Sequence, residues 1–200
     1  MNYTGPKVKL SRKLGIELTQ KSNKYSSRKP YPPGQHGASK RRIKQSDYGR
    51  QLIEKQRLRL QYNVSERQMR NYFQKATQLV GNTGDILVQL LESRLDAFIY
   101  RAGLTRSIYA ARQLVNHGHI NINGKRVTVP SCQLKVNDLI LIKEKTRKND
   151  NIQDSIRSAA PPPYIELSKA DFTAKYLYVP PREEIGVVCD VPLVVEFYSR

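Results

Sequence analysis

The most regular hydrophobic pattern in the chain lies between residues 65 and 80. Apolar positions follow at spacings of three and four, which predicts an amphipathic helix whose buried face carries Met69, Tyr72, Phe73, Ala76, Leu79 and Val80. The segment Ser65–Gln68 has the form of a capping box, and Gly81-Asn82 suits the end of the helix. With a weaker helical pattern on either side, residues 46–93 are predicted to form a small helical body. Its aromatic stripe is interpreted as core rather than as a ligand-binding surface.

Residues 94–150 change from a helical to an extended pattern. Two short helical stretches end at Gly103 and Gly118. Two alternating segments joined by Asn123-Gly124 come next and predict a hairpin with a type I′ turn. A further strand is predicted at Leu139–Ile142. We predict a compact module in which two helices pack on a small twisted sheet.

The two ends of the chain carry weaker patterns. Residues 1–44 lack a sustained period, and residues 31–37 contain adjacent prolines and two glycines, so we predict an extended arm that orders when it binds its partner. Residues 151–163 end in three consecutive prolines and are predicted to be a linker. Alternation at residues 172–178 and 193–198 predicts strands that return to pack on the helical body.

These elements predict an α+β protein. It has a mainly helical N-terminal body with a basic extended arm and a returning C-terminal β segment, and a small α/β module is inserted in it. The predicted domains are residues 1–93, completed by 151–200, and the module at 94–150.

The distribution of charge along the chain indicates what kind of partner the protein binds. The formal net charge is +18, from 35 Lys and Arg against 17 Asp and Glu. Residues 1–62 hold 16 basic and 3 acidic side chains, residues 94–150 hold 11 and 4, and the segments between and after them carry no surplus. Such a partition predicts two surfaces for a polyanion. No apolar run approaches the roughly 20 residues of a membrane span, so nucleic acid is expected rather than a membrane.

The predicted RNA contacts are cations, aromatic rings and neutral hydrogen-bonding side chains. Guanidinium groups pair with phosphates, and flat side chains stack on splayed bases. In the arm and the helical body we select Lys7, Lys9, Arg12, Lys13, Tyr31, Gln35, His36, Lys40, Arg41, Arg42, Tyr48, Arg50, Lys55 and Arg70. In the module we select Arg94, Arg106, Arg112, His117, Lys125 and Arg126. Asp96 is expected to be an internal partner for one arginine.

The sequence offers little for catalysis or metal binding. It contains no P-loop, no GxGxxG motif and no nucleophile elbow, so we expect no enzyme. Cys132 and Cys189 lie far apart without a CxxC motif, and His117 and His119 have no evident third ligand. We therefore predict no metal and no cofactor.

Several motifs resemble a known family. Arg94-Leu95-Asp96, Ala111–Val115, His117–Ile120 and Asn123-Gly124-Lys125 look like the small RNA-binding module of the S-four type, which also occurs in pseudouridine synthases and some aminoacyl-tRNA synthetases. Tyr31–Gly37, Ser46–Gly49, Arg67–Tyr72 and Val195–Ser199 resemble the ribosomal protein S-four family of bacteria and organelles, nearly end to end and in order.

The resemblance implies a structural protein that binds small-subunit ribosomal RNA directly and early and nucleates assembly of the body. It implies ribosomal protein S-five and other small-subunit proteins as neighbours, and with S-five an influence on translational accuracy. Some members face the channel through which mRNA enters. The expected location is the ribosome of the cytoplasm, with an organellar ribosome left open. Relatives with an N-terminal cysteine cluster bind zinc, but residues 1–131 here contain no cysteine.

Two other functions compete with the ribosomal one. The first is an RNA-modifying enzyme anchored by the module, but the rest of the chain is too small for a synthase fold. The second is a dedicated RNA-binding translational repressor, which would contact messenger RNA and no ribosomal RNA.

Overall fold

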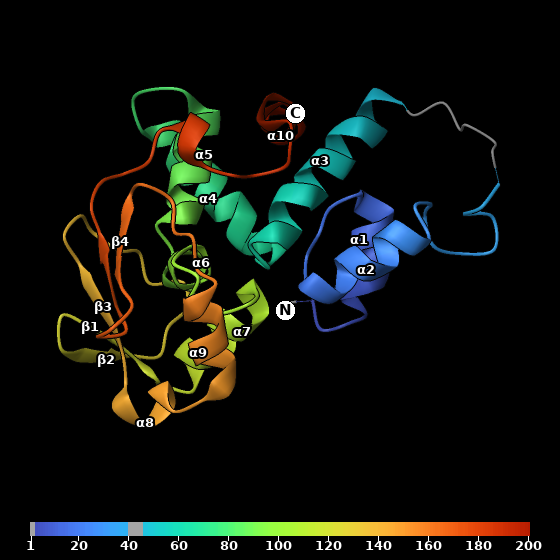
Figure 1. Cartoon of the computed structure of the whole chain (residues 1–200). Coiled ribbons are helices and arrows are strands. Elements are labelled where there is room, and N and C mark those ends of the chain that lie inside the picture. Colours follow the sequence, from blue (N-terminus) through green and yellow to red (C-terminus); the bar gives the residue numbers. More distant parts are fainter. Residues whose placement is uncertain (1–2, 40–45) are drawn as a thin grey trace. The chain divides into compact units, whose positions relative to one another are not determined.

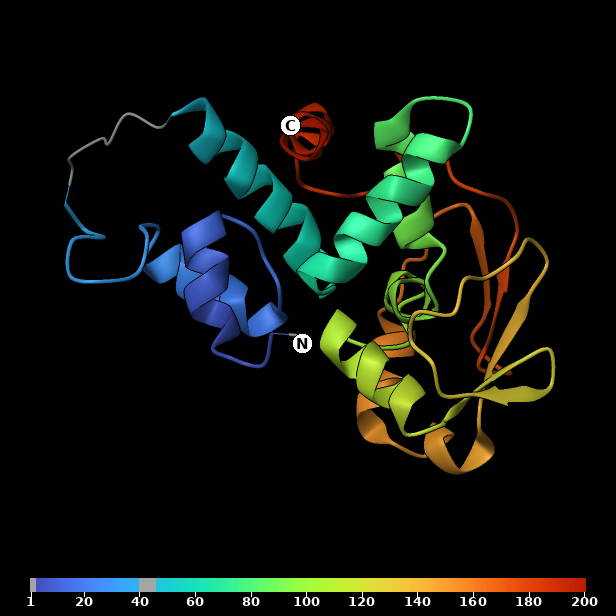
Figure 2. The same cartoon turned by 180° about the vertical axis from the view of Figure 1, so that it is seen from behind.

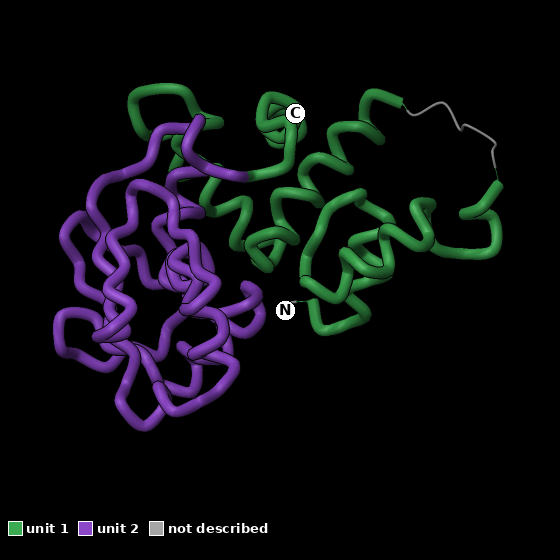
Figure 3. The backbone as a smooth tube through the Cα atoms, in the orientation of Figure 1, with its two compact units in different colours: residues 1–87, 187–200 green, residues 88–186 purple. Residues whose placement is uncertain are grey.

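The computed structural model describes residues 3–39 and 46–200. It confirms an α+β protein and divides the chain into two compact units (Figure 3). The first unit is Met1–Leu87 with Val187–Arg200, and the second is Val88–Gly186. This division differs from the predicted one, because residues 151–186 belong to the second unit and the final 14 residues return to the first.

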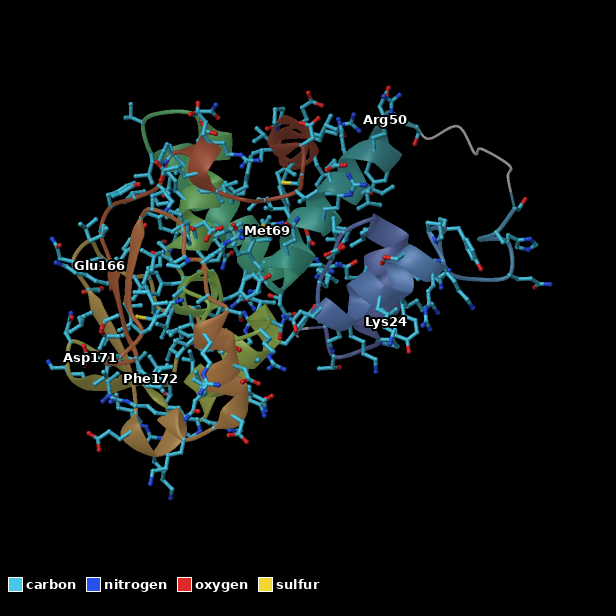
Figure 4. The ribbon with its side chains drawn as sticks, in the orientation of Figure 1. Lys24, Arg50, Met69, Glu166, Asp171 and Phe172 are labelled. Carbon is cyan, nitrogen blue, oxygen red and sulfur yellow. The ribbon has the colours of Figure 1, made fainter. Side chains whose placement is uncertain are left out.

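The helical body forms as predicted. It contains α3 (Asp47–Gln61), α4 (Glu66–Gln78) and the beginning of α5 (Thr83–Glu92), which continues into the second unit. The capping box of α4 is complete, since Ser65 Oγ accepts from the backbone N–H of Gln68 and Gln68 Oε1 accepts from that of Ser65, both at 3.3 Å. Met69 points into the unit, whereas Lys24 and Arg50 point away from it (Figure 4).

The predicted C-terminal strand at 193–198 is wrong, because these residues lie in α10 (Val191–Ser199). Pro192 occupies the first turn, where a proline is well tolerated. Val191 and Val194, three residues apart, are buried, and the helix packs on α3 and α4. A Cβ on Gly84 would lie 2.8 Å from Cγ1 of Val191, so the glycine permits this close packing. Tertiary contacts outweigh the β propensity of the valines.

Much of the predicted extended arm is a helical hairpin, which corrects the prediction. Helix α1 (Lys7–Leu14) ends at Gly15 with φ +67°, and α2 (Gln20–Arg28) begins after its N-cap, Thr19. The two helices meet through buried serines, with Ser11 Oγ donating to Ser22 Oγ at 3.0 Å. The few apolar side chains are buried chiefly at and after the end of α1, namely Leu14, Ile16 and Leu18. Because α1 and α2 meet through polar side chains, the sequence of these helices carries no hydrophobic period that would predict them.

In the second unit, the first part follows the prediction. Helices α6 (Leu95–Arg101) and α7 (Ile108–Asn116) precede β1 (Ile120–Ile122), β2 (Lys125–Val127) and β3 (Leu139–Ile142). Asn123 and Gly124 have φ of 48° and 79°, both left-handed as a type I′ turn requires. The turn pairs Ile122 with Lys125.

The sheet is larger than predicted. Strands β4 (Ile165–Ser168) and β5 (Thr173–Tyr176) extend it to the antiparallel order β2-β1-β3-β5-β4 (Figures 1 and 2). The prediction of a strand near residues 172–178 is therefore confirmed, but this strand pairs with β3 in the module and not with the helical body. A further short helix, η1 (Arg182–Glu184), follows β5.

The predicted linker is also mostly helical. After α8 (Glu144–Arg147), α9 (Asp150–Arg157) buries Ile152 and Ile156 in the core of the second unit. That core also contains Phe98 and Tyr176, whose rings meet edge to face with centroids 5.7 Å apart. Phe98 precedes Ile152 and Ile156 by more than 50 positions, so the short pattern of α9 could not indicate that the two isoleucines are buried.

Candidate RNA-binding surfaces

The first surface surrounds the C-terminal end of α7. Lys125 and Arg126 lie exposed on β2. Gly118, which follows α7 with φ +70°, leaves space that the Arg126 guanidinium occupies, since a Cβ on this glycine would overlap Nε and Nη2 of that arginine. The Asn-Gly turn and Gly118 thus place a guanidinium beside the end of the helix.

Two histidines and a lysine complete this cluster. Burial lowers the pKa of His119, and the nearby positive groups of His117, Lys143 and Arg126 lower it further. His119 is therefore neutral at pH 7, and its Nδ1 is hydrogen-bonded to Thr146 Oγ1 at 2.9 Å. His117 is exposed, with its ring centroid 6.0 Å from that of His119. We name His117, His119, Arg126 and Lys143 the α7 basic cluster.

Arg106 lies in the turn before α7. Its Nη2 donates to Asp154 Oδ2 at 2.9 Å, and the two side chains remain 45% and 54% exposed. An ion pair this exposed contributes little to stability because water screens it. Arg106 therefore remains accessible to a phosphate.

Arg94 and Arg112 have to be removed from the predicted RNA contacts. Asp96 is fully buried, and its carboxylate accepts from Arg94 at 2.7 and 3.0 Å and from Arg112 at 2.6 and 3.1 Å. Arg94 is itself 0% exposed and Arg112 8%. A phosphate cannot reach guanidinium groups enclosed in this way. Asp96 was expected to pair internally with one arginine, and it pairs with two.

Lys55 is a second correction. Only 4% of it is exposed, because its ammonium donates to Glu66 Oε2 at 2.9 Å and lies 4.7 Å from the centroid of the Phe197 ring. Phe197 belongs to α10, 142 positions later in the sequence, so the helical pattern around Lys55 could not indicate its burial. Lys55 stabilises the helical body instead of facing RNA.

The arm divides into exposed and internal cations. Lys9 and Lys13 are exposed on α1. Arg12 instead ties the segment after α2 to α1, donating to the carbonyls of Lys29 at 3.1 Å and Tyr31 at 2.9 Å, with its guanidinium over the Tyr31 ring. Lys7 donates to the carbonyl of Thr4 at 2.9 Å.

The remaining predicted contacts vary in exposure. Five of them are exposed, namely Gln35, His36, Tyr48, Arg50 and Arg70. Tyr48 also packs near Phe197, with ring centroids 5.8 Å apart. Arg50 forms an ion pair with Asp47 at 3.2 Å. Lys40, Arg41 and Arg42 lie outside the described residues. Four further cations on or next to α2 are exposed and were not among the predicted contacts, namely Lys21, Lys24, Arg28 and Lys29. Their signal was the surplus of positive charge in this segment.

Metal binding and membrane insertion find no support in the described residues. In the described part of the chain, no group of three or more His, Cys, Asp and Glu side chains is arranged to hold a metal ion. Cys132 is a free cysteine. Over residues 3–39 and 46–200, no helix combines the length and apolarity needed to cross a bilayer.

Glu66 connects three elements of the helical body, which leads to a prediction about pH. Burial acts to raise its pKa, but hydrogen bonds from Lys55 and from Tyr198, at 2.7 Å, together with the charges of Lys55 and Arg59, outweigh it and hold the pKa below the usual 4.5. A carboxyl with a lowered pKa in the folded state stabilises the protein above its unfolded-state pKa, and that stability is lost as the pH falls through the folded-state pKa.

We expect Glu66→Gln to lower the melting temperature at pH 7 by about 3 °C, the shift that roughly 1 kcal/mol produces in a protein of this size. The difference from the wild type should shrink as the pH falls through the lowered folded-state pKa, below which Glu66 is protonated in both states. Circular dichroism melts at several pH values measure this. Glu196→Gln is the matched control, since Glu196 accepts from the neutral amide of Gln51. A Glu66→Gln effect that did not vary with pH would contradict the assignment.

Comparisons with known proteins agree with the geometry. The family described as ribosomal protein S4/S9 N-terminal domain matches residues 2–92, and the S4 domain family matches residues 93–140. The chain is 44% identical over 204 residues to small ribosomal subunit protein uS4 of Streptomyces avermitilis, covering 100% of this chain and 99% of the relative. It is 46% identical over 199 residues to uS4 of Listeria welshimeri, covering 99% and 98%. These matches confirm the resemblance: the chain belongs to the uS4 family of small ribosomal subunit proteins.

Proposed function

We propose that this protein is a structural component of the small ribosomal subunit that binds ribosomal RNA directly. Support comes from the relatives, which carry the name of a small-subunit protein and align with the chain over nearly its whole length. The observation that carries RNA binding is the α7 basic cluster, where a helix end and a hairpin present positive and neutral donors together. Such a group of donors suits phosphates and 2′-hydroxyls.

The first unit supplies a second RNA-binding surface in this proposal. Among residues 3–39, eight side chains are Lys or Arg and one, Glu17, is acidic. Because Ser11 and Ser22 hold α1 against α2, the exposed cations Lys9, Lys13, Lys21 and Lys24 extend from a folded hairpin. A preformed surface loses less conformational entropy on binding than a disordered arm does.

The proposed role is to bind early and to nucleate assembly of the small-subunit body, next to ribosomal protein S-five and other small-subunit proteins. With S-five, the protein would influence translational accuracy, and messenger RNA would pass close to it. No catalytic step forms part of this proposal.

Binding to naked small-subunit ribosomal RNA tests the function. The full chain is expected to bind the transcript at one copy per molecule and to co-sediment with small subunits through a moderate-salt wash. The logarithm of the binding constant should fall linearly with the logarithm of the salt concentration, because each neutralised phosphate releases counterions. Transfer RNA at equal mass is the control. A protein that stays free of small subunits, or whose cross-links in cells are to messenger RNA alone, would overturn the ribosomal assignment in favour of a repressor.

A further inference from the structure

The second unit contains a pocket between α7 and α9, next to the α7 basic cluster, whose His117 and His119 line it. Its volume is about 390 Å³, which falls within the roughly 300–1,000 Å³ of small-ligand sites. One wall is formed by α7 and the turn before it, and the other by the residues from α8 to α9. All of them belong to the same compact unit.

The walls of the pocket combine two kinds of chemistry. Leu104, Leu114 and Ile152 provide aliphatic surface, and Ala110 provides the open space of a small side chain. Gln113 and Asn151 add side-chain amides, which can both donate and accept hydrogen bonds. Apolar surface with a few amides suits a flat heterocycle, whose faces are apolar and whose edges carry donors and acceptors.

Positive charge lies at and near the pocket, on Arg106 in its wall and on Arg126 and Lys143 beside His119. Arg106 and His117 line it and are both exposed. His119 also lines it and has Arg126 and Lys143 as charged neighbours. The hydrogen bond of Arg106 to Asp154 uses one of the five N–H donors of the guanidinium, so others remain for an anion. An anionic group is therefore favoured next to the heterocycle.

We propose that this pocket holds one unpaired nucleotide of the bound RNA. Its base leaves the helical stack and lies against the aliphatic wall between α7 and α9, and its phosphate is paired by Arg106. The inference rests on the proposed function, since it requires the protein to bind RNA. Binding at this pocket favours RNA sites where a nucleotide is already unpaired. Extruding a paired base would add a few kcal/mol of free energy to the cost of binding.

The test uses the full chain and two hairpin RNAs of one stem sequence. One carries 2-aminopurine as a single unpaired bulge, and the other carries it paired in the stem. The wild type is expected to bind the bulged RNA on the order of tenfold more tightly, the scale of one base contact. The 2-aminopurine fluorescence should change on binding of the bulged RNA and remain constant with the paired RNA.

Ala110→Leu fills the pocket with a side chain that favours helix. It should abolish the preference and leave binding of the paired hairpin unchanged. Asn116→Leu, exposed on the same helix and absent from the pocket wall, is the matched control and should keep the preference. Gln113→Ala, an exposed change that keeps the fold, should reduce the preference about threefold by removing one amide.

Three outcomes would overturn the inference. The first is equal binding of both hairpins by the wild type, and the second is an undiminished preference in Ala110→Leu and Gln113→Ala. The third is displacement of the bulged RNA by equimolar adenosine monophosphate, which would assign the pocket to a free nucleotide. Each of these leaves binding to small-subunit ribosomal RNA intact, whereas absence of that binding would refute the proposed function itself.

Discussion

Asp96→Asn is expected to destabilise the second unit by about 3–5 kcal/mol, the cost of leaving buried charges without their partner. The carboxylate of Asp96 is the acceptor for both Arg94 and Arg112, and it also accepts from the backbone N–H of Ala97 at 3.0 Å. Asparagine keeps the size of the side chain but removes its charge, so two guanidinium groups would share a neutral amide in the interior. Relative to a total stability of roughly 5–15 kcal/mol, this loss is large.

Urea denaturation followed by circular dichroism measures this effect. Asp154→Asn is the matched control, because it removes the same kind of carboxylate from the exposed ion pair with Arg106. The control should change stability by less than about 1 kcal/mol. Equal effects of the two substitutions would mean that burial does not determine the contribution of Asp96.

Lys125→Glu combined with Arg126→Glu is expected to weaken binding to small-subunit ribosomal RNA by at least about tenfold. Each phosphate contact contributes about 0.7–0.9 to the slope of log binding constant against log salt concentration, so the slope should fall by roughly 1.4–1.8. Arg112 is unsuitable for such a test, because reversing its charge would break the buried pair with Asp96. Filter binding at several salt concentrations gives both quantities.

The control for this experiment carries the same change of net charge elsewhere in the unit. Lys169→Glu with Lys175→Glu alters the β4–β5 turn and β5, which β1 and β3 separate from β2 in the sheet. We expect this variant to keep nearly the full slope. If both double variants lost affinity equally, the total charge and not the position of Lys125 and Arg126 would govern binding.

Local signals in the sequence were sufficient for several elements. The capping box at Ser65 and Gln68 and the period that follows it define α4, because both act within one or two helical turns. Asn123-Gly124 defines the hairpin in the same way, since left-handed φ angles at two successive positions favour these two residue types. The excess of positive charge likewise required no structure to indicate a polyanionic partner.

Contacts between distant residues explain the predictions that were wrong. Val194 and Val195 are β-branched and favour a strand, yet they lie in α10, which packs against α3. Ile152 and Ile156 were assigned to a linker, although they complete a core supplied by residues far away in the chain. In the arm, α1 and α2 meet through a buried hydrogen bond between the hydroxyls of Ser11 and Ser22. A hydrophobic pattern cannot indicate such a polar contact.

For the RNA-binding surfaces, the sequence by itself determined the kind of partner, the segments that carry the charge and the family. The tertiary structure decided which cations are available. Arg94, Arg112 and Lys55 have the same side-chain chemistry as Arg106 and Lys125, but they are enclosed with Asp96 and Glu66. The reason is physical. The charge of a side chain follows from its covalent chemistry, whereas its exposure depends on which distant residues fold against it.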